Sequence, residues 1–87
     1  MKATLVGRER RVCRLEPGEV RRLPFEGALV GFYVACPGCG FRNFTLVTGQ
    51  HVVDSKDALT LAPGFWCDGP RCERHLHVKD GELVVTE

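Results

Sequence analysis

The sequence predicts a small, mostly β domain, and three observations support this fold class. Short runs of β-prone residues alternate with turn residues along the chain. No stretch keeps an apolar repeat of about 3.6 residues over three helical turns, so no full helix is expected. The 87 residues suffice for one domain, with no interdomain linker. We therefore expect a single domain built around an antiparallel sheet.

The N-terminal segment, residues 1–27, predicts a hairpin that packs beside the rest of the sheet. It opens with a short β-prone run, Lys2–Val6. A Pro-Gly pair at positions 17 and 18 suits the two central positions of a type II turn. We expect this turn to join Val12–Leu15 to Glu19–Leu23 as the two arms of the hairpin.

The middle of the chain predicts the central strands. Ala28–Ala35 is the most apolar run, and we expect it to form a strand that ends at Cys36. Phe41–Val47 is expected to return beside it. Ala58–Leu61 is a candidate for one more short strand, and Lys56–Leu61 is compatible with a single helical turn.

The C-terminal segment has the clearest hairpin signal. His75–Lys79 and Glu82–Thr86 are two β-prone runs joined by an Asp-Gly pair at positions 80 and 81. Asp-Gly favours the positive φ values of a type I′ turn. Because side chains alternate along a strand, His75 and His77 are expected on one face.

The cysteines indicate a metal site. There are five of them, and an odd number argues against a closed set of disulfides. A domain this small buries little surface and is often stabilised by a metal ion. Cys36 and Cys39 lie in Cys-Pro-Gly-Cys, a spacing that places two thiolates on one side of a zinc ion. Gly40 can adopt the positive φ that turns backbone N–H groups toward the sulfurs. We therefore predict one structural Zn²⁺.

The remaining zinc ligands are expected among Cys67, Cys72, His75 and His77. Cys67 with Cys72 completes a four-cysteine site, and Cys72 with His75 completes a site of three cysteines and one histidine. Spacing alone slightly favours the four-cysteine set. His77 lies one pleat repeat further along its strand and is the weakest candidate. Cys13 is outside the pattern, and we expect it to be a small buried hydrophobic residue.

Charge is distributed unevenly along the chain. The net charge is only +1, which argues against a generic binder of polyanions. Residues 1–24 carry +4 and the remainder carries −3. A basic end can mark a nucleic-acid or acidic-protein surface, although a solvated arginine-rich strand pair explains it as well. The candidate binding residues are Arg8, Arg10, Arg11, Arg14, Arg21 and Arg22, with Phe41 or Phe44 able to stack on bases.

Enzymatic readings fit the pattern less well. A thioredoxin-like pair needs a helix after the second cysteine, whereas Phe41–Val47 is strand-like. Zinc deaminases have a His-x-Glu motif before their cysteine pair, and none precedes Cys36. A hydrolytic zinc keeps one position open, but this chain offers more ligands than one ion needs. We expect no catalysis and no small-molecule substrate.

The chain also lacks the signals of secretion or membrane insertion. Charged residues follow Lys2–Val6 at once, so this run does not form a signal peptide. No stretch approaches the roughly 20 apolar residues that span a bilayer. We therefore expect a cytoplasmic protein without a membrane partner, in a reducing setting where thiols are more often ligands than disulfides.

Several short motifs carry a family resemblance. The run Cys36–Gly40 resembles the knuckle of zinc ribbons and rubredoxins. Together with Leu59–Pro63 and Cys72–Glu82, it is similar to a small bacterial and phage family known as a domain of unknown function with a Cys/His metal site. The similarity covers about residues 29–85.

This resemblance implies a particular ligand set and setting. It implies that Cys72 and His75 pair with Cys36 and Cys39, which leaves Cys67 as an extra thiol. It brings no established activity, and it implies an accessory protein of a phage or mobile element, acting in the host cytoplasm.

Together these observations define one expectation for the whole chain. We expect a zinc-ribbon-like antiparallel sheet over residues 28–87, the metal-binding core, with the basic hairpin of residues 1–27 beside it. The expected function is a non-enzymatic zinc-binding interaction module with a protein partner. The alternative is a nucleic-acid-binding zinc ribbon that uses the arginine-rich N-terminal segment.

Overall fold

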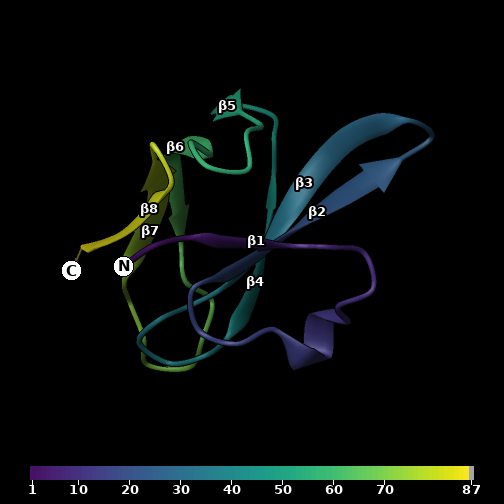
Figure 1. Ribbon diagram of the computed structural model, residues 1–87. Coiled ribbons are helices and arrows are strands. Elements are labelled where there is room, and N and C mark those ends of the chain that lie inside the picture. The colour runs from purple at the N-terminus through teal and green to yellow at the C-terminus, as the bar shows by residue number, and fades with distance from the viewer. Residues whose placement is uncertain (87) are drawn as a thin grey trace.

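The computed structural model describes residues 1–86, which form two four-stranded β-sheets packed face to face (Figure 1). The predicted mostly β fold is confirmed. The strands are β1 (Thr4–Val6), β2 (Glu19–Phe25), β3 (Ala28–Ala35), β4 (Arg42–Leu46), β5 (His51–Val53), β6 (Thr60–Trp66), β7 (His75–Lys79) and β8 (Glu82–Thr86). One short 3-10 helix, η1, covers Val12–Arg14.

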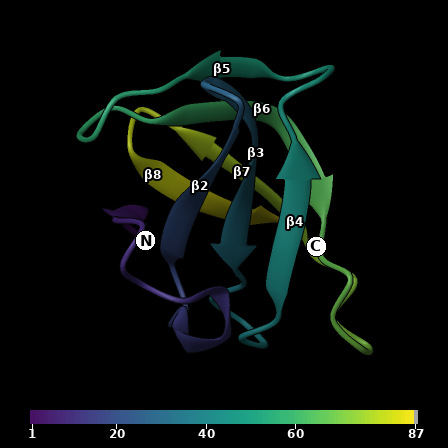
Figure 2. The ribbon, with the colours of Figure 1, turned by 90° about the vertical axis from the view of Figure 1, so that its right-hand side faces the viewer.

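The strand order is β1-β2-β3-β4 in the first sheet and β5-β6-β7-β8 in the second. Neighbouring strands are antiparallel, except that β1 runs parallel to β2. The strands of the two sheets cross in the second view (Figure 2). Two sheets form where a single sheet was expected, because one face of a lone sheet would leave its apolar side chains in water.

The core lies between the two sheets. Phe32 and Val34 of β3 and Leu61, Leu76 and Val78 of the second sheet are fully buried and belong to one cluster. Alternation along each strand accounts for this, because every second residue of a half-buried strand faces the core. The cluster extends to two cysteines, so the candidate metal site is continuous with the core.

The hairpin predicted for the N-terminal segment is wrong. The Pro-Gly turn does form, with Gly18 at φ 89° and the Glu19 N–H donating to the Glu16 carbonyl over 2.9 Å. However, Val12–Arg14 is η1 and has no buried residue, so this segment offers no apolar face to pair as a strand. The strand after the turn, β2, pairs instead with β1 and β3.

The N-terminal residues connect the two sheets. Lys2 forms an isolated bridge with Glu82, and the Ala3 N–H donates to the Gly81 carbonyl over 2.9 Å. Directly after this, Thr4–Val6 forms β1 and pairs with β2. Within residues 1–86, the outer strands are β1 and β4 in the first sheet and β5 and β8 in the second, and the Lys2 bridge links the β1 and β8 ends.

The other expected elements are largely confirmed. The strand at Ala28–Ala35 and the C-terminal hairpin have the predicted bounds, and Asp80 and Gly81 have φ of 49° and 82°. The expected strand at residues 58–61 begins at Thr60 and continues past a bulge and a cis Ala62-Pro63 bond to Trp66. Strand β5 was not predicted, and residues 56–58 form a turn rather than part of a helix.

Residues 1–86 include no helix with the length and hydrophobicity needed to cross a bilayer.

Candidate metal centre

Each sheet has one cysteine-containing turn between two neighbouring strands. The first cysteine turn, residues 36–41, links β3 to β4. The second cysteine turn, residues 67–74, links β6 to β7. Each therefore leaves one strand of a sheet and enters the next, which brings two pairs of thiols to the same end of the molecule.

The first cysteine turn is closed by two backbone hydrogen bonds. The Gly40 N–H donates to the Cys36 carbonyl over 2.8 Å, and the Cys36 N–H donates to the Phe41 carbonyl over 2.9 Å. Gly40 has φ of 78°, the left-handed conformation that glycine adopts without steric cost. The positive φ expected at Gly40 is confirmed.

The second cysteine turn has a similar frame but a longer and different sequence. The Cys67 N–H donates to the Arg74 carbonyl over 2.8 Å, which corresponds to the bond between Cys36 and Phe41. The Cys72 N–H donates to the Gly69 carbonyl over 3.1 Å. Glu73, which follows the second cysteine as Gly40 does, also has a positive φ, 50°. The backbone frame is thus repeated without a glycine at this position.

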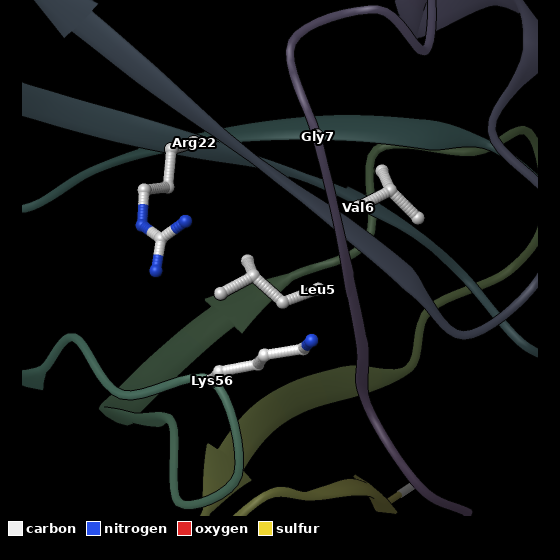
Figure 3. Close-up of a pocket in the computed structure, with 5 residues that line it drawn as sticks. All are labelled: Leu5, Val6, Gly7, Arg22 and Lys56. Carbon is white, nitrogen blue, oxygen red and sulfur yellow. The ribbon is translucent and has the colours of Figure 1, made fainter.

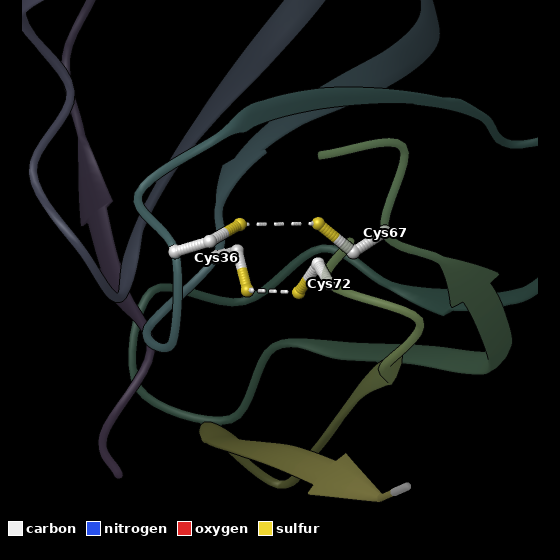
Figure 4. A group of neighbouring side chains, drawn as sticks. Cys36, Cys67 and Cys72 are labelled. Carbon is white, nitrogen blue, oxygen red and sulfur yellow. Dashed lines mark hydrogen bonds between the residues drawn. The ribbon is translucent and has the colours of Figure 1, made fainter. Parts of the chain in front are cut away.

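The two turns bring four sulfur atoms together. The Sγ atoms of Cys36, Cys39, Cys67 and Cys72 all lie within 4.8 Å of one another. The Cys36–Cys72 pair is 3.7 Å apart and the Cys39–Cys67 pair 3.6 Å (Figure 4). Metal–sulfur bonds of about 2.3 Å in a tetrahedron place the sulfurs about 3.8 Å from each other. The donor set and its spacing therefore fit one tetrahedral metal ion.

N–H groups lie close to the sulfurs of Cys67 and Cys72 and would stabilise the negative charge of thiolates there. Cys67 Sγ accepts from Asn43 Nδ2 and from the Gly69 N–H, both over 3.3 Å. The guanidinium of Arg74 lies 3.8 Å from Cys72 Sγ. Asn43 is held in place by the Asp68 N–H, which donates to its side-chain oxygen over 2.8 Å. Such outer contacts orient ligands and stabilise their charge.

Sequence reasoning missed Asn43, although a signal for it exists. Asn43 is 1% exposed, on the inward face of β4. The alternation expected of the returning strand places Asn43 and Thr45 on the same face. A buried amide at such a position needs partners, and the thiol site supplies them.

The thiols of the metal-free cluster differ in acidity. Burial raises the pKa of the Cys67 thiol to about 12, despite the N–H groups of Asn43 and Gly69. Burial also raises the pKa of Cys39. Burial acts in the same direction on Cys72, but hydrogen bonds with the neighbouring thiols and with Arg74 outweigh it and lower that pKa to about 7. Cys72 therefore ionises more readily than Cys39 or Cys67.

His75 lies outside the four-sulfur group. Its ring packs edge-on against Trp66, with centroids 5.1 Å apart, and lies 6.0 Å from the ring of His77. The group of candidate ligands contains Cys67, not His75, which differs from the ligand set that the family resemblance implied. Cys13 is exposed, so its predicted burial is wrong; it lies in η1 rather than in a strand.

The six arginines of the N-terminal segment do not form one surface. Arg10 pairs with Glu19 at 2.5 Å, and Arg22 pairs with Asp54 at 2.6 Å. Arg21 and Arg22 are consecutive in β2 and project to opposite faces. The others, Arg8, Arg11 and Arg14, are exposed near or within η1. Phe41 and Phe44 are 40% and 41% exposed.

No protein-family model, curated protein or solved structure matches this chain. The resemblance to the bacterial and phage family therefore rests on its short motifs, and no family is assigned.

Proposed function

We propose that this chain is a non-catalytic, zinc-stabilised module that binds another macromolecule. The observation that carries the proposal is the four-sulfur group, whose two closest pairs are 3.6 and 3.7 Å apart. Four cysteine thiolates fill a tetrahedral coordination sphere and leave no position for a water molecule or a substrate. This composition favours a structural ion over a catalytic one.

The position of the site supports a structural role. Cys36 follows β3, Cys67 follows β6 and Cys72 lies just before β7, so one ion would join both sheets. Structural zinc contributes about 10–16 kcal/mol of apparent binding free energy, which appears as folding free energy. A core of this size supplies only a few kcal/mol by itself. Folding would then depend on the ion.

Two classes of partner fit a module of this kind. A protein partner is supported by large apolar side chains that the sheets leave exposed, notably Phe25 and Trp66 at 65% and 63%. Nucleic acid is not supported by the arginine-rich segment as a whole, because Arg10 and Arg22 are ion-paired. A nucleic-acid partner is supported by a smaller group of cationic residues near the end of β1, namely Arg8, Arg21, Arg22 and Lys56.

The metal content of freshly purified, tag-free protein tests the proposal. We expect one zinc per chain by native mass spectrometry and loss of the β-sheet circular dichroism signal after chelation. Cys67→Ser should lose the metal, whereas Cys13→Ser, a matched loss of one thiol outside the cluster, should keep it. His75→Ala should also keep it.

Three results would contradict the proposal. A metal-free protein with the same circular dichroism spectrum before and after chelation would remove the structural ion. Metal retained by Cys67→Ser but lost from His75→Ala would restore the site of three cysteines and one histidine. Iron in the purified protein, recognised by its mass and visible absorption, would contradict zinc as the proposed ion.

A further inference from the structure

A basic groove lies where β1 ends. Val6, the last residue of β1, is opposite Arg21 of β2, and β2 continues beyond it from Arg22 to Phe25. A cleft of about 270 Å³ opens at this step, lined by Leu5, Val6, Gly7, Arg22 and Lys56 (Figure 3). A second cleft of about 140 Å³ adjoins it, shares Val6, Gly7 and Arg22, and adds Arg8, Arg21 and Pro24. We call the two clefts together the β1-end groove.

The β1-end groove has an excess of positive charge. Four cationic residues line it: Arg22 and Lys56 line the larger cleft, and Arg8, Arg21 and Arg22 line the smaller one. Asp54 neutralises part of this charge through its 2.6 Å contact with Arg22. The carboxylate of Glu9 lies directly against Gly7, at the rim of the groove. Three positive charges therefore remain beyond the Asp54 pair, opposed by one carboxylate.

Arg21, which lines the smaller cleft, has one side-chain donor without a hydrogen-bond partner among the described residues. Its Nη2 donates to the Arg8 carbonyl over 3.3 Å, but its Nε is buried and has no hydrogen-bond partner. A buried N–H without a partner is destabilising and is uncommon in folded proteins. The hydrogen-bonding capacity of the Arg21 side chain is therefore not filled by the residues around it.

An aromatic row continues from Arg21 across the outer face of the first sheet. Arg21 is the cross-strand partner of Tyr33, and Tyr33 is the partner of Phe44, so the three side chains share one face. The rings of Tyr33 and Phe44 are 5.2 Å apart. Phe44 lies over Gly31, where an added Cβ would meet the ring at 2.7 Å, and it is 41% exposed. The row therefore shares its face with Arg21 of the smaller cleft. Arg22, the partner of the buried Phe32, lies on the opposite face and lines the larger cleft with Lys56, at the edge of β2 that β1 leaves unpaired.

We propose that the β1-end groove and the aromatic row together bind single-stranded nucleic acid. The cations contact backbone phosphates, while Tyr33 and Phe44 stack on bases. This ligand is favoured over an acidic peptide or a free anion because it alone carries both phosphate charge, for the cations along the open edge of β2, and planar bases, for the aromatic row. The inference rests on the proposed binding function and names its ligand.

The test uses fluorescence anisotropy of the full chain with labelled 12-nucleotide single strands, one of DNA and one of RNA. Binding should weaken with salt, with a log–log slope of about −2 if three phosphates are contacted. Arg8→Ala and Lys56→Ala should each weaken binding at least threefold and make the slope shallower. Arg14→Ala, an exposed arginine outside the groove, is the matched control and should change affinity less than twofold.

Two further variants separate the roles of the groove. Phe44→Ala should weaken binding about tenfold with the salt slope unchanged, because stacking releases no counterions. Glu9→Gln should tighten binding, because it removes the carboxylate at the rim. Comparing the affinities for the DNA and the RNA strand shows which of the two nucleic acids the site prefers.

The proposal fails if neither strand binds, if Arg14→Ala weakens binding as much as Arg8→Ala, or if polyglutamate competes as well as the single strands. Competition by inorganic phosphate as effective as by the strands would reduce the site to a simple anion site and also overturn it. Metal content and circular dichroism of each variant keep this test separate from the proposed zinc. A metal-free chain that folds and binds would refute the zinc and leave this inference standing.

Discussion

The first and second cysteine turns reach similar backbone geometry from different sequences. In the first turn, Gly40 takes the positive φ, and two residues separate the cysteines. In the second turn, four residues separate the cysteines, and Arg71 and Glu73 take positive φ values. For residues with a side chain, this conformation costs roughly 1–2 kcal/mol each. The first turn is therefore predisposed to its shape, whereas the second depends more strongly on its contacts.

Gly69→Ala addresses the contact between the turns and should have the largest effect. An added Cβ at Gly69 would lie 2.7 Å from Cys39 Sγ and 2.9 Å from Phe41 Cβ, both in the first turn. Separating the turns should lower the free energy of unfolding by roughly 3 kcal/mol, as overpacking does, and weaken metal binding at least tenfold. Chemical denaturation and competition with a chromogenic chelator measure the two effects.

Gly38→Ala is the matched change in the first turn. There the new methyl group meets the end of the Arg74 side chain, which is flexible and can move. We expect a loss of less than about 1 kcal/mol. Equal losses for the two variants would mean that the turns do not pack closely at Gly69.

Asn43→Ala should have an intermediate effect that depends on pH. Its amide N–H lowers the pKa of Cys67, so its removal raises that pKa further. Protons then compete better with the metal at Cys67, and metal release on acidification should begin at a higher pH than in the parent protein. The unpaired Asp68 N–H should add roughly 1–3 kcal/mol of destabilisation.

A metal-sensitive dye followed during an acid titration measures this shift. Thr45→Val is the control, because Thr45 is also buried on the inward face of β4, while its hydroxyl bonds only the neighbouring Leu46 carbonyl at 3.5 Å. An unchanged release profile for Asn43→Ala would show that the amide does not stabilise the bound thiolate.

Substitutions at the residue that follows the second cysteine of each turn, Gly40 and Glu73, should have the smallest effects on stability. The effects should have opposite signs in the two turns. Gly40→Ala introduces a side chain at φ 78° and should destabilise the protein by about 1 kcal/mol. Glu73→Gly relieves the same strain at φ 50°, but it also loosens the unfolded chain, so a gain of about 0.5 kcal/mol is expected. Thermal unfolding of the metal-loaded forms measures both, and a loss for Glu73→Gly would remove the asymmetry.

The same contrast explains how far the sequence predicts the site. The first cysteine turn could be predicted in detail, because Cys-Pro-Gly-Cys-Gly specifies both ligand spacing and backbone conformation locally. The second turn contains no such local signal: Cys67, Cys72 and His75 were alternatives until the fold showed which side chains meet the first turn. That choice is made by tertiary contacts, which sequence spacing does not encode.

The fold, like the site, was predictable where the signal is local and not where it depends on long-range pairing. The hairpin at Asp80-Gly81 was predictable because its turn residues and strand alternation agree. The hairpin placed around Pro17-Gly18 was wrong although its turn is correct, because a turn specifies a change of direction and not the strand that pairs next. The parallel pairing of β1 with β2 is long-range in the same sense. It joins Thr4–Val6 to Glu19–Arg21, and Leu5 of β1 packs against the core between the sheets.

The bridge between Lys2 and Glu82 has a consequence for the order in which the molecule is assembled. Because it joins residues that are far apart in the sequence, this bridge can form only after Glu82 has left the ribosome. The first cysteine turn leaves the ribosome well before the second, so Cys36 and Cys39 can capture an ion while its other ligands are still being synthesised. An ion held by all four cysteines would shorten the loop of chain that must close when Lys2 meets Glu82. A shorter loop has a lower entropic cost of closure. A metal ion available during synthesis would then favour the final closure of the fold.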